Sequence, residues 1–374
     1  MNKPKQKKLL SILFIAGLLM AILYWAANSK HRDDFAGESF KIDKMLRFTP
    51  VKDQGDSGFH WIYAMLATIE SEHLMLNDSI NLAPTYTARF FLQQKAKEHF
   101  LSRGEKAIDM KGTGVTAIRL LQYFGTVDEN AFLLTKPVDW RQTMVGLTEA
   151  SDSCLRQKTS VASFVERTEN VLDKMIRPVP QYVFMAGMEY TTAEFARSVC
   201  RRNEYVMLTS FAHHSFGKHS FLEMKHDLGL EIIDNISRND IVNVPVDTLQ
   251  ARIDCAIVDG HPVYWSGHIN EQEFSFKRGT ARLANEKSEV NQKVRQVEFE
   301  QKRQTENHAM AIVGMAHDKN SRKYYICKNS WGTKNPYKGL VFMSENYLRA
   351  RTLSIMMSQD ALDGIAVSQR KTKG

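Results

Sequence analysis

Hydrophobic residues recur at three- and four-residue steps through much of the first half of the chain. Such spacing places apolar side chains on one face of an α-helix. Residues 85–102 and 161–177 follow it, and the stretch TGVTAIRLLQYFG is typical of a helix that ends at Gly125. A further helix is predicted just beyond Ser57, with Asp56 or Ser57 as its cap. Its periodic positions are Trp61, Ala64, Met65, Thr68, Ile69 and His73.

The pattern changes after residue 203 to short apolar runs separated by turn residues, which is typical of β-strands. These runs are EYVMLTSF, HPVYWSG, HAMAIVGMA, KYYICKNSW and GLVFMS. The highly charged residues 280–306 interrupt them, and we expect a solvated loop or helix there. The chain is therefore predicted to be an α+β protein whose helical half precedes its β-rich half.

The N-terminus carries a predicted membrane anchor. Residues 9–27 form an uncharged run of 19 residues behind the basic flank 1–8, long enough to cross a bilayer. Lysines before the span favour a cytoplasmic N-terminus and an extracytoplasmic domain, periplasmic or at the cell surface. The polar residues 28–44 suit a linker. A cleaved signal peptide, which would make the protein secreted, is the alternative, although Trp25 or Ala26 makes a poor cleavage site.

Charge argues against a nucleic-acid partner. The formal net charge is +8, with 43% hydrophobic and 25% charged residues. The excess sits at the two ends, and the remaining basic residues nearly balance the 42 acidic ones. The terminal basic residues are Lys3, Lys5, Lys7, Lys8, Arg370, Lys371 and Lys373. No basic stripe with interleaved aromatics marks a nucleic-acid surface, and no cofactor is expected.

The four cysteines lack the paired spacing of a zinc or thioredoxin-type site. Outside the cytoplasm, Cys154 and Cys200 are the most plausible pair for a disulfide. Buried free thiols are an equally good interpretation.

Several segments, taken in order, resemble the papain-like cysteine peptidases, and most closely their bleomycin hydrolase and aminopeptidase C branch. They are VKDQGDSGFHWIYA, YVMLTSFAHHSF, DGHPVYWSGHINEQEFSFKRG, NHAMAIVGMAHD, YYICKNSWG and KGLVFMSENYL. The resemblance spans residues 45–365, and the basic tail 366–374 follows. It implies a two-lobed papain-like fold, helical in one half and β-rich in the other.

The resemblance also implies catalytic roles. His308 matches the family's general base and acid, and Asn329 matches the residue that orients it, with Trp331 shielding their hydrogen bond. Gln54 matches the side-chain donor of the oxyanion hole. Such a peptidase needs a thiolate, which a helix N-terminus and a nearby imidazolium stabilise. At the nucleophile position, however, the chain has His60.

Three interpretations follow from His60. The first is an inactive peptidase homologue that binds peptides or a protein partner at the membrane, because a neutral imidazole is a ligand rather than an attacking group toward amides. The second is an active peptidase or aminopeptidase with a non-standard nucleophile, for which Ser57 is nearest. The third is a metal site formed by His60 and His308, although no further ligand is evident.

Other positions also depart from the family. Phe59 precedes the nucleophile position and is expected to narrow the cleft, and His268 replaces an acidic residue. In HHSFGKHSF, the adjacent His213 and His214 would point to opposite faces of a strand, so one ion could bind both only at a bend. Members of this branch form hexamers and place their C-terminal tail in the cleft, so a homo-oligomer and such a tail are open possibilities here.

Overall fold

The computed structural model describes residues 38–185, 187–228, 241–301 and 304–369. The chain divides into two compact units, Met1–Phe40 and Lys41–Gly374, and the fold below is that of the second. The predicted anchor at 9–27, its flank 1–8 and most of the linker lie outside the described residues. Within the described part, no helix combines the length and apolar character needed to cross a bilayer.

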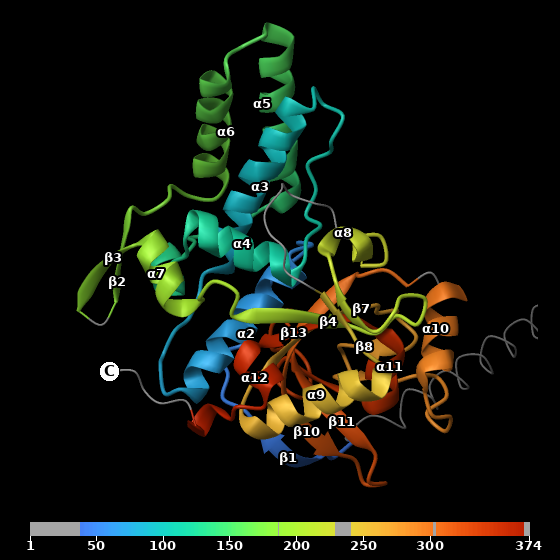
Figure 1. Ribbon diagram of the computed structural model, residues 1–374. Coiled ribbons are helices and arrows are strands. Elements are labelled where there is room, and N and C mark those ends of the chain that lie inside the picture. The colour runs from blue at the N-terminus through green and yellow to red at the C-terminus, as the bar shows by residue number, and fades with distance from the viewer. Residues whose placement is uncertain (1–37, 186, 229–240, 302–303, 370–374) are drawn as a thin grey trace, which may run out of the picture. The chain divides into compact units, whose positions relative to one another are not determined.

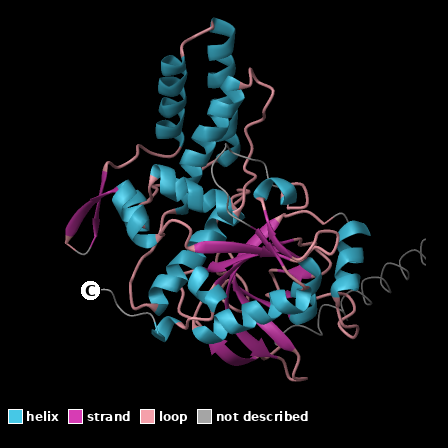
Figure 2. Ribbon diagram, in the orientation of Figure 1, coloured by secondary structure: helices cyan, strands magenta, loops and turns pink. Residues whose placement is uncertain are grey.

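Helices predominate up to residue 200 (Figures 1 and 2). In this half lie α2 (His60–Met75), α3 (Pro84–Leu101), α4 (Gly114–Phe124), η1 (Glu129–Phe132), α5 (Trp140–Gln157), α6 (Val161–Met175) and α7 (Thr192–Val199). The second half has α8 (Phe221–Met224), α9 (Val246–Asp259), α10 (Gln292–Gln301), α11 (Glu345–Arg351), α12 (Gln359–Asp363) and η2 (Val367–Gln369). The predictions at 85–102 and 161–177 are confirmed by α3 and α6.

Two helix ends were predicted, one correctly. Helix α4 ends at Gly125, whose φ of +79° and close approach to Thr192 suit only glycine. The start of α2 was predicted wrongly, because the helix begins at His60 behind Phe59, which makes no side-chain cap. The Ser57 hydroxyl instead donates to the main-chain oxygen of Gln54 at 2.8 Å.

The strands of the second half form one mixed sheet in the order β5-β6-β4-β13-β7-β10-β11-β12-β9-β8, with β1 paired to β10. They are β1 (Lys41–Met45), β4 (Tyr205–Thr209), β5 (Gly217–His219), β6 (Ile241–Asn243), β7 (Val263–Gly267), β8 (Phe274–Ser275), β9 (Thr280–Ala281), β10 (His308–His317), β11 (Lys323–Lys328), β12 (Leu340–Ser344) and β13 (Thr352–Ser358). A separate hairpin joins β2 (Tyr182–Met185) and β3 (Met188–Thr191). Each of the five predicted runs contains a strand, so the β-rich second half is confirmed.

Two segments differ from expectation. Strand β1 begins inside the predicted linker 28–44. Residues from Lys41 onward therefore belong to the sheet, because β1 pairs antiparallel with β10. For the charged region 280–306 we expected a solvated loop or helix. Helix α10 forms there, but not all of its side chains are solvated. Arg295 is buried and donates to the main-chain oxygens of Ser210, Arg349 and Thr352.

The helices α3 to α7 form a helical lobe, and helix α2 lies between this lobe and the sheet (Figure 1). It packs against α3 and α4 on one side and against β7 and β10 on the other. Twelve of its sixteen residues are buried, as expected for a helix covered on both sides. This position brings the start of α2 beside the start of β10, where the candidate site forms.

The four cysteines are free, three of them buried and Cys255 exposed. The disulfide considered between Cys154 and Cys200 is therefore absent, and the alternative of buried apolar thiols holds. Burial raises the pKa of the Cys200 thiol far above its ordinary value. A buried thiol with a raised pKa is chemically inert.

Candidate active site

The sequence-predicted site residues come from the start of α2, with the loop before it, and from the ends of two neighbouring strands. Gln54 lies in the loop before α2, His60 is the first residue of α2, and His308 is the first residue of β10. Asn329 directly follows β11, the antiparallel neighbour of β10. Pairing of β10 with β11 therefore positions Asn329 against His308.

The His308 side chain is buried and contacts one polar and two aromatic side chains. Its Nε2 lies 2.8 Å from Oδ1 of Asn329, so the neutral ring carries its hydrogen on Nε2 and keeps the Nδ1 lone pair free. The Trp331 ring lies 4.7 Å from the His308 ring, centroid to centroid, and Phe274 lies 5.7 Å away. His308 is 1% exposed. The expected shielding by Trp331 is present.

The His60 ring faces His308. Their centroids are 5.5 Å apart and their planes are tilted by 51°. Burial, with a smaller contribution from His308, lowers the pKa of His60 to about 3. Burial also lowers the pKa of His308 to about 4, although the hydrogen bond with Asn329 favours its cation. Both imidazoles are consequently neutral at physiological pH.

The amide of Gln54 is turned toward its own loop. Its Nε2 donates to the main-chain oxygen of Ser57 at 2.6 Å, and its Oε1 accepts from the Ser330 hydroxyl at 2.6 Å. The Gln54 main-chain N–H donates to the Ser330 oxygen at 2.8 Å. These bonds join the loop before α2 to the segment after Asn329. The bond to Ser57 also takes one of the two Nε2 hydrogens that an oxyanion hole would use.

Phe59 does not narrow the cleft, contrary to expectation. Its side chain is fully buried and packs edge-on against Trp61, Phe91 and Trp140 in the helical lobe. An aromatic side chain gains most free energy in such a core. Since helical residues at neighbouring positions point in different directions, Phe59 points into the lobe while His60 faces His308.

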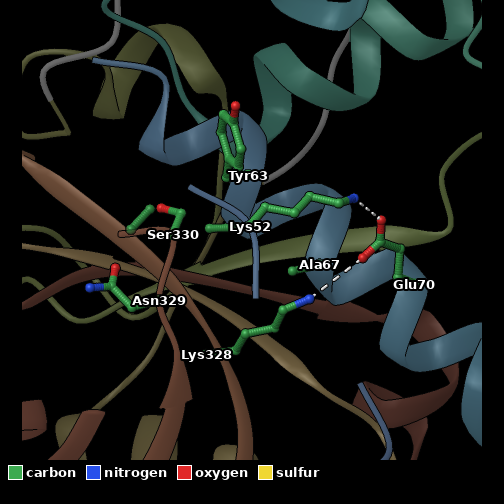
Figure 3. Close-up of a pocket in the computed structure, with 9 residues that line it drawn as sticks. Lys52, Tyr63, Ala67, Glu70, Lys328, Asn329 and Ser330 are labelled. Atoms are coloured by element: carbon green, nitrogen blue, oxygen red, sulfur yellow. Dashed lines mark hydrogen bonds and ion pairs between the residues drawn. The ribbon is translucent and has the colours of Figure 1, made fainter. Parts of the chain in front are cut away.

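Charged residues lie near Asn329, where Figure 3 shows Glu70 between Lys52 and Lys328. Glu70 of α2 binds Lys52 at 2.7 Å and lies 3.6 Å from Lys328, the residue before Asn329. It also accepts from Thr49 and from the Leu82 N–H. The cavity among these side chains measures only about 10 Å³, room for about one water. It is therefore a packed contact between α2 and the end of β11 rather than a ligand pocket.

The predicted metal pair of His60 and His308 lacks a third ligand among the described residues. Among the described residues, one group of three potential metal ligands does converge. It consists of His213, His214 and Asp227 and lies elsewhere in the fold. Asp227 carried no sequence signal, because it stands alone in a polar segment. The supporting residues Glu70 and Lys328 were missed for a similar reason, since each occupies a position that the apolar pattern leaves unmarked.

The described part of the C-terminal tail lies at the other end of α2. Ala366, Val367 and Ser368 line a cavity of about 580 Å³ together with Met75, the last residue of that helix. Met75 and His60 are separated by the full length of α2, about 22 Å at 1.5 Å per residue. Whether the tail enters the cleft concerns residues 370–374, which lie outside the described part.

Comparison with known proteins agrees with this geometry. Residues 188–371 match the Peptidase C1-like family. Aminopeptidase G of Lactobacillus delbrueckii subsp. lactis is 25% identical over 184 residues, which cover 43% of this chain and only 36% of that protein. The structure of PepW from Lactobacillus rhamnosis HN001 superposes with a TM-score of 0.65 at 13% identity, covering 98% of this chain and 95% of that one. Xylellain, a cysteine protease from Xylella fastidiosa, gives a TM-score of 0.44 at 15% identity and 87% coverage of both chains.

The fold is thus the papain-like α+β fold, and the chain is a homologue of the papain-like peptidases. Within that superfamily the matches confirm the resemblance to the bleomycin hydrolase and aminopeptidase C branch. The family match includes His308 and Asn329 but begins after Gln54 and His60. The roles of these residues rest on the motifs and the geometry.

Proposed function

We propose that this protein is an inactive member of the papain-like peptidases that binds a peptide or a protein segment in the cleft without hydrolysing it. The observation that carries the proposal is the neutral His60 ring facing His308 at 5.5 Å, at the nucleophile position of the motif. A base and its orienting amide are retained there without a thiol to activate.

The chemistry of imidazole supports this proposal. Attack by His60 on a peptide bond would give an acyl-imidazole, and the amine is the poorer leaving group, so the adduct would return to the starting amide. The Gln54 amide donates one of its two Nε2 hydrogens to the main-chain oxygen of Ser57, which turns it toward its own loop. The nucleophile that amide hydrolysis requires is therefore lacking.

No described cysteine substitutes for the missing thiol. Cys327 on β11 pairs with Ile312, four residues along β10 from His308 and so about 13 Å away. Cys154 lies in α5, Cys255 lies in α9, and Cys200 directly follows α7. Ser57, the other candidate nucleophile, is buried, and its hydroxyl donates to the main-chain oxygen of Gln54.

The test is hydrolysis of aminoacyl and dipeptidyl coumarin amides by the purified full-length protein, with and without a thiol-alkylating inhibitor. We expect no inhibitor-sensitive turnover. Binding of fluorescein-labelled hexapeptides, followed by anisotropy, is expected to persist and to weaken in Trp331→Ala. Turnover that disappears with the inhibitor, or with Ser57→Ala, would show that the protein is an active hydrolase.

We also propose that residues 9–27 hold the domain at the outer side of a membrane. The support is the length of the apolar run and the lysines before it. Alkaline carbonate extraction of membranes tests this: full-length protein should stay in the pellet, whereas residues 28–374 should not. Full-length protein in the soluble fraction, shortened at its N-terminus, would favour a cleaved signal peptide and secretion.

A further inference from the structure

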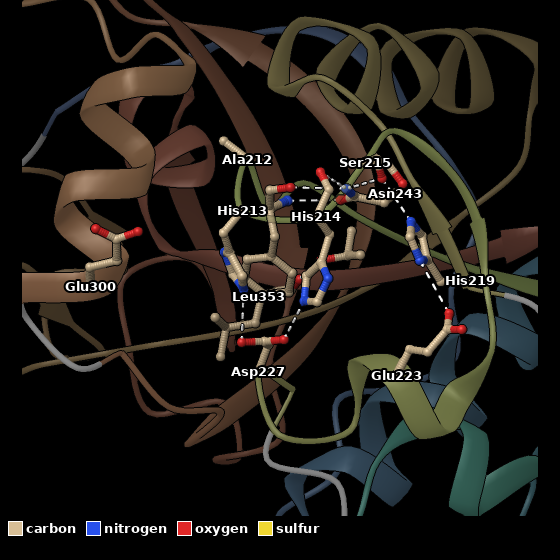
Figure 4. Close-up of polar contacts among 12 residues, drawn as sticks. Ala212, His213, His214, Ser215, His219, Glu223, Asp227, Asn243, Glu300 and Leu353 are labelled. Carbon is tan, nitrogen blue, oxygen red and sulfur yellow. Dashed lines mark hydrogen bonds and ion pairs between the residues drawn. The ribbon is translucent and has the colours of Figure 1, made fainter.

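A second histidine cluster lies away from the candidate active site, in the turn between β4 and β5 (Figure 4). His213 and His214 are adjacent in the sequence, yet both reach one carboxylate. Nε2 of His213 lies 3.0 Å from Oδ1 of Asp227, and Nε2 of His214 lies 2.7 Å from Oδ2. The two rings are 4.3 Å apart, centroid to centroid.

A bend in the main chain makes this convergence possible. In a strand the two side chains would point to opposite faces, but residues 212–214 form a turn, so the alternation is lost. The bend expected as the condition for shared binding is therefore present. The third member, Asp227, follows helix α8.

Asn243, a fully buried residue of β6, fixes the conformation of the turn. Its Oδ1 accepts from the Phe211 N–H at 2.8 Å. Its Nδ2 donates to the main-chain oxygens of Phe211 and Ser215, each at 2.9 Å, and lies 3.3 Å from that of His214. A buried amide with four bonds to one loop fixes the positions of both histidines. Such pre-organisation is what a binding site requires.

The donor set and its spacing suit a divalent transition metal. Zn²⁺ accepts imidazole nitrogen and carboxylate oxygen at about 2.0–2.2 Å, which puts neighbouring ligand atoms about 3.3 Å apart in a tetrahedron. One ligand atom from each of the three residues lies within 4.8 Å of the others, and the two hydrogen-bonded separations need only a small widening. Hard cations such as Mg²⁺ and Ca²⁺ prefer an all-oxygen set.

The site is open to solvent. The side chains of His213, His214 and Asp227 are 35%, 24% and 21% exposed. This exposure gives an ion a path to the three ligands and leaves space for water at a fourth position. We propose that His213, His214 and Asp227 form a binding site for a divalent transition-metal ion of the zinc class.

The surroundings predict how affinity can be raised. Nδ1 of His213 lies 2.8 Å from Nε2 of Gln296, a donor, so the ring without metal carries its hydrogen on Nε2. A metal at Nε2 moves that hydrogen to Nδ1, which then needs an acceptor. Since Gln296 Nε2 also donates to Oε1 of Glu300 at 2.8 Å, the change is made as Gln296→Glu together with Glu300→Gln. The pair supplies an acceptor for Nδ1, keeps an oxygen for the Ala212 N–H and avoids two facing carboxylates. Carboxylate partners of this kind change metal affinity about 10–100-fold.

The proposal is tested by titrating metal-free full-length protein with Zn²⁺ against a chromophoric chelator, and with Co²⁺ by visible absorption. We expect one equivalent bound and a tetrahedral cobalt spectrum without a thiolate band. His214→Ala and Asp227→Asn should each weaken zinc binding at least tenfold, and Gln296→Glu with Glu300→Gln should strengthen it. Circular dichroism checks that each variant is folded.

Two control variants separate this site from other histidines. His317→Ala removes another histidine paired with a carboxylate, that of Asp43, and should leave zinc binding unchanged. His60→Ala should also leave it unchanged. Failure to bind zinc, binding insensitive to both His214→Ala and Asp227→Asn, or binding abolished by His60→Ala would each overturn the proposal.

Discussion

Burial sets the protonation state of the two facing imidazoles, His60 and His308. The His60 ring is neutral chiefly because burial lowers its pKa, and His308 lowers that pKa further. His308 loses its charge for the same reason, even with Asn329 favouring the cation. A thiolate beside His308 would supply the negative charge that stabilises its protonated form. With His60 there, each ring disfavours a charge on the other.

These pKa values make the protein sensitive to acid. An unfolded histidine has a pKa of about 6.5, so between that pH and about 4 the unfolded chain binds protons that folded His308 and His60 do not. Stability should be fully present above pH 6.5 and fall as the pH decreases toward 4 and 3. Each ring contributes up to about 2 kcal/mol of the loss between pH 6.5 and pH 5, from 1.36 kcal/mol per pH unit.

The measurement is urea unfolding at pH 7 and pH 5 for the wild type and for His60→Gln. Glutamine cannot take up a proton, so the variant should lose less stability on acidification than the wild type. An equal loss in both proteins would mean that His60 titrates normally in the folded state.

At the scale of elements, one ionic cluster fixes α2 relative to β11. Glu70 is 1% exposed and sits between Lys52 and Lys328, so the helix that begins with His60 is tied to the strand that ends before Asn329 (Figure 3). Burial lowers the pKa of Lys328 to about 8, despite the attraction of Glu70. The positions of His60 and Asn329 therefore depend on a buried carboxylate some ten residues away along the helix.

Removing that carboxylate should be costly. Glu70→Gln keeps the shape but leaves the buried Lys328 without its counter-ion, and breaking such pairs costs about 3–5 kcal/mol. Asp78→Asn is the control, since Asp78 is 55% exposed and pairs with His73 near the end of the same helix. It should cost no more than about 1 kcal/mol. Urea unfolding at pH 7 compares the two, and a loss below 1 kcal/mol for Glu70→Gln would contradict the assigned role.

Periodicity in the sequence was sufficient for elements with a regular pattern and insufficient for those without one. The β10 and β11 runs were predicted because they are apolar and bounded by turns. Strand β13 was not, because polar and apolar residues alternate in TLSIMMS only as far as Ile355 and the strand is buried on both faces. Strand β1 is mostly exposed, so its polar residues resemble a linker until β10 pairs with them. Arg295 was taken as solvated because no local pattern marks the main-chain oxygens that it reaches.

At the scale of the molecule, the β sheet and the helical lobe meet along α2, and the candidate site lies where the start of that helix adjoins the starts and ends of strands. Motif order predicted which residues would meet: His308, Asn329 and Trp331 are together as expected. What the motifs could not predict is side-chain direction, which depends on neighbours distant in the sequence. Phe59 turns into the helical lobe, and the Gln54 amide turns toward Ser57.

The central claim is that His60 occupies the nucleophile position of an otherwise retained base and orienting amide. Restoring a thiol with His60→Cys and measuring the rate of iodoacetamide labelling at that residue tests it directly, since alkylation needs the thiolate but not an oxyanion hole. At pH 6 the rate should exceed that of an ordinary cysteine at least tenfold and should fall in His60→Cys with His308→Ala. An ordinary rate in folded His60→Cys, unchanged by removal of His308, would contradict the account.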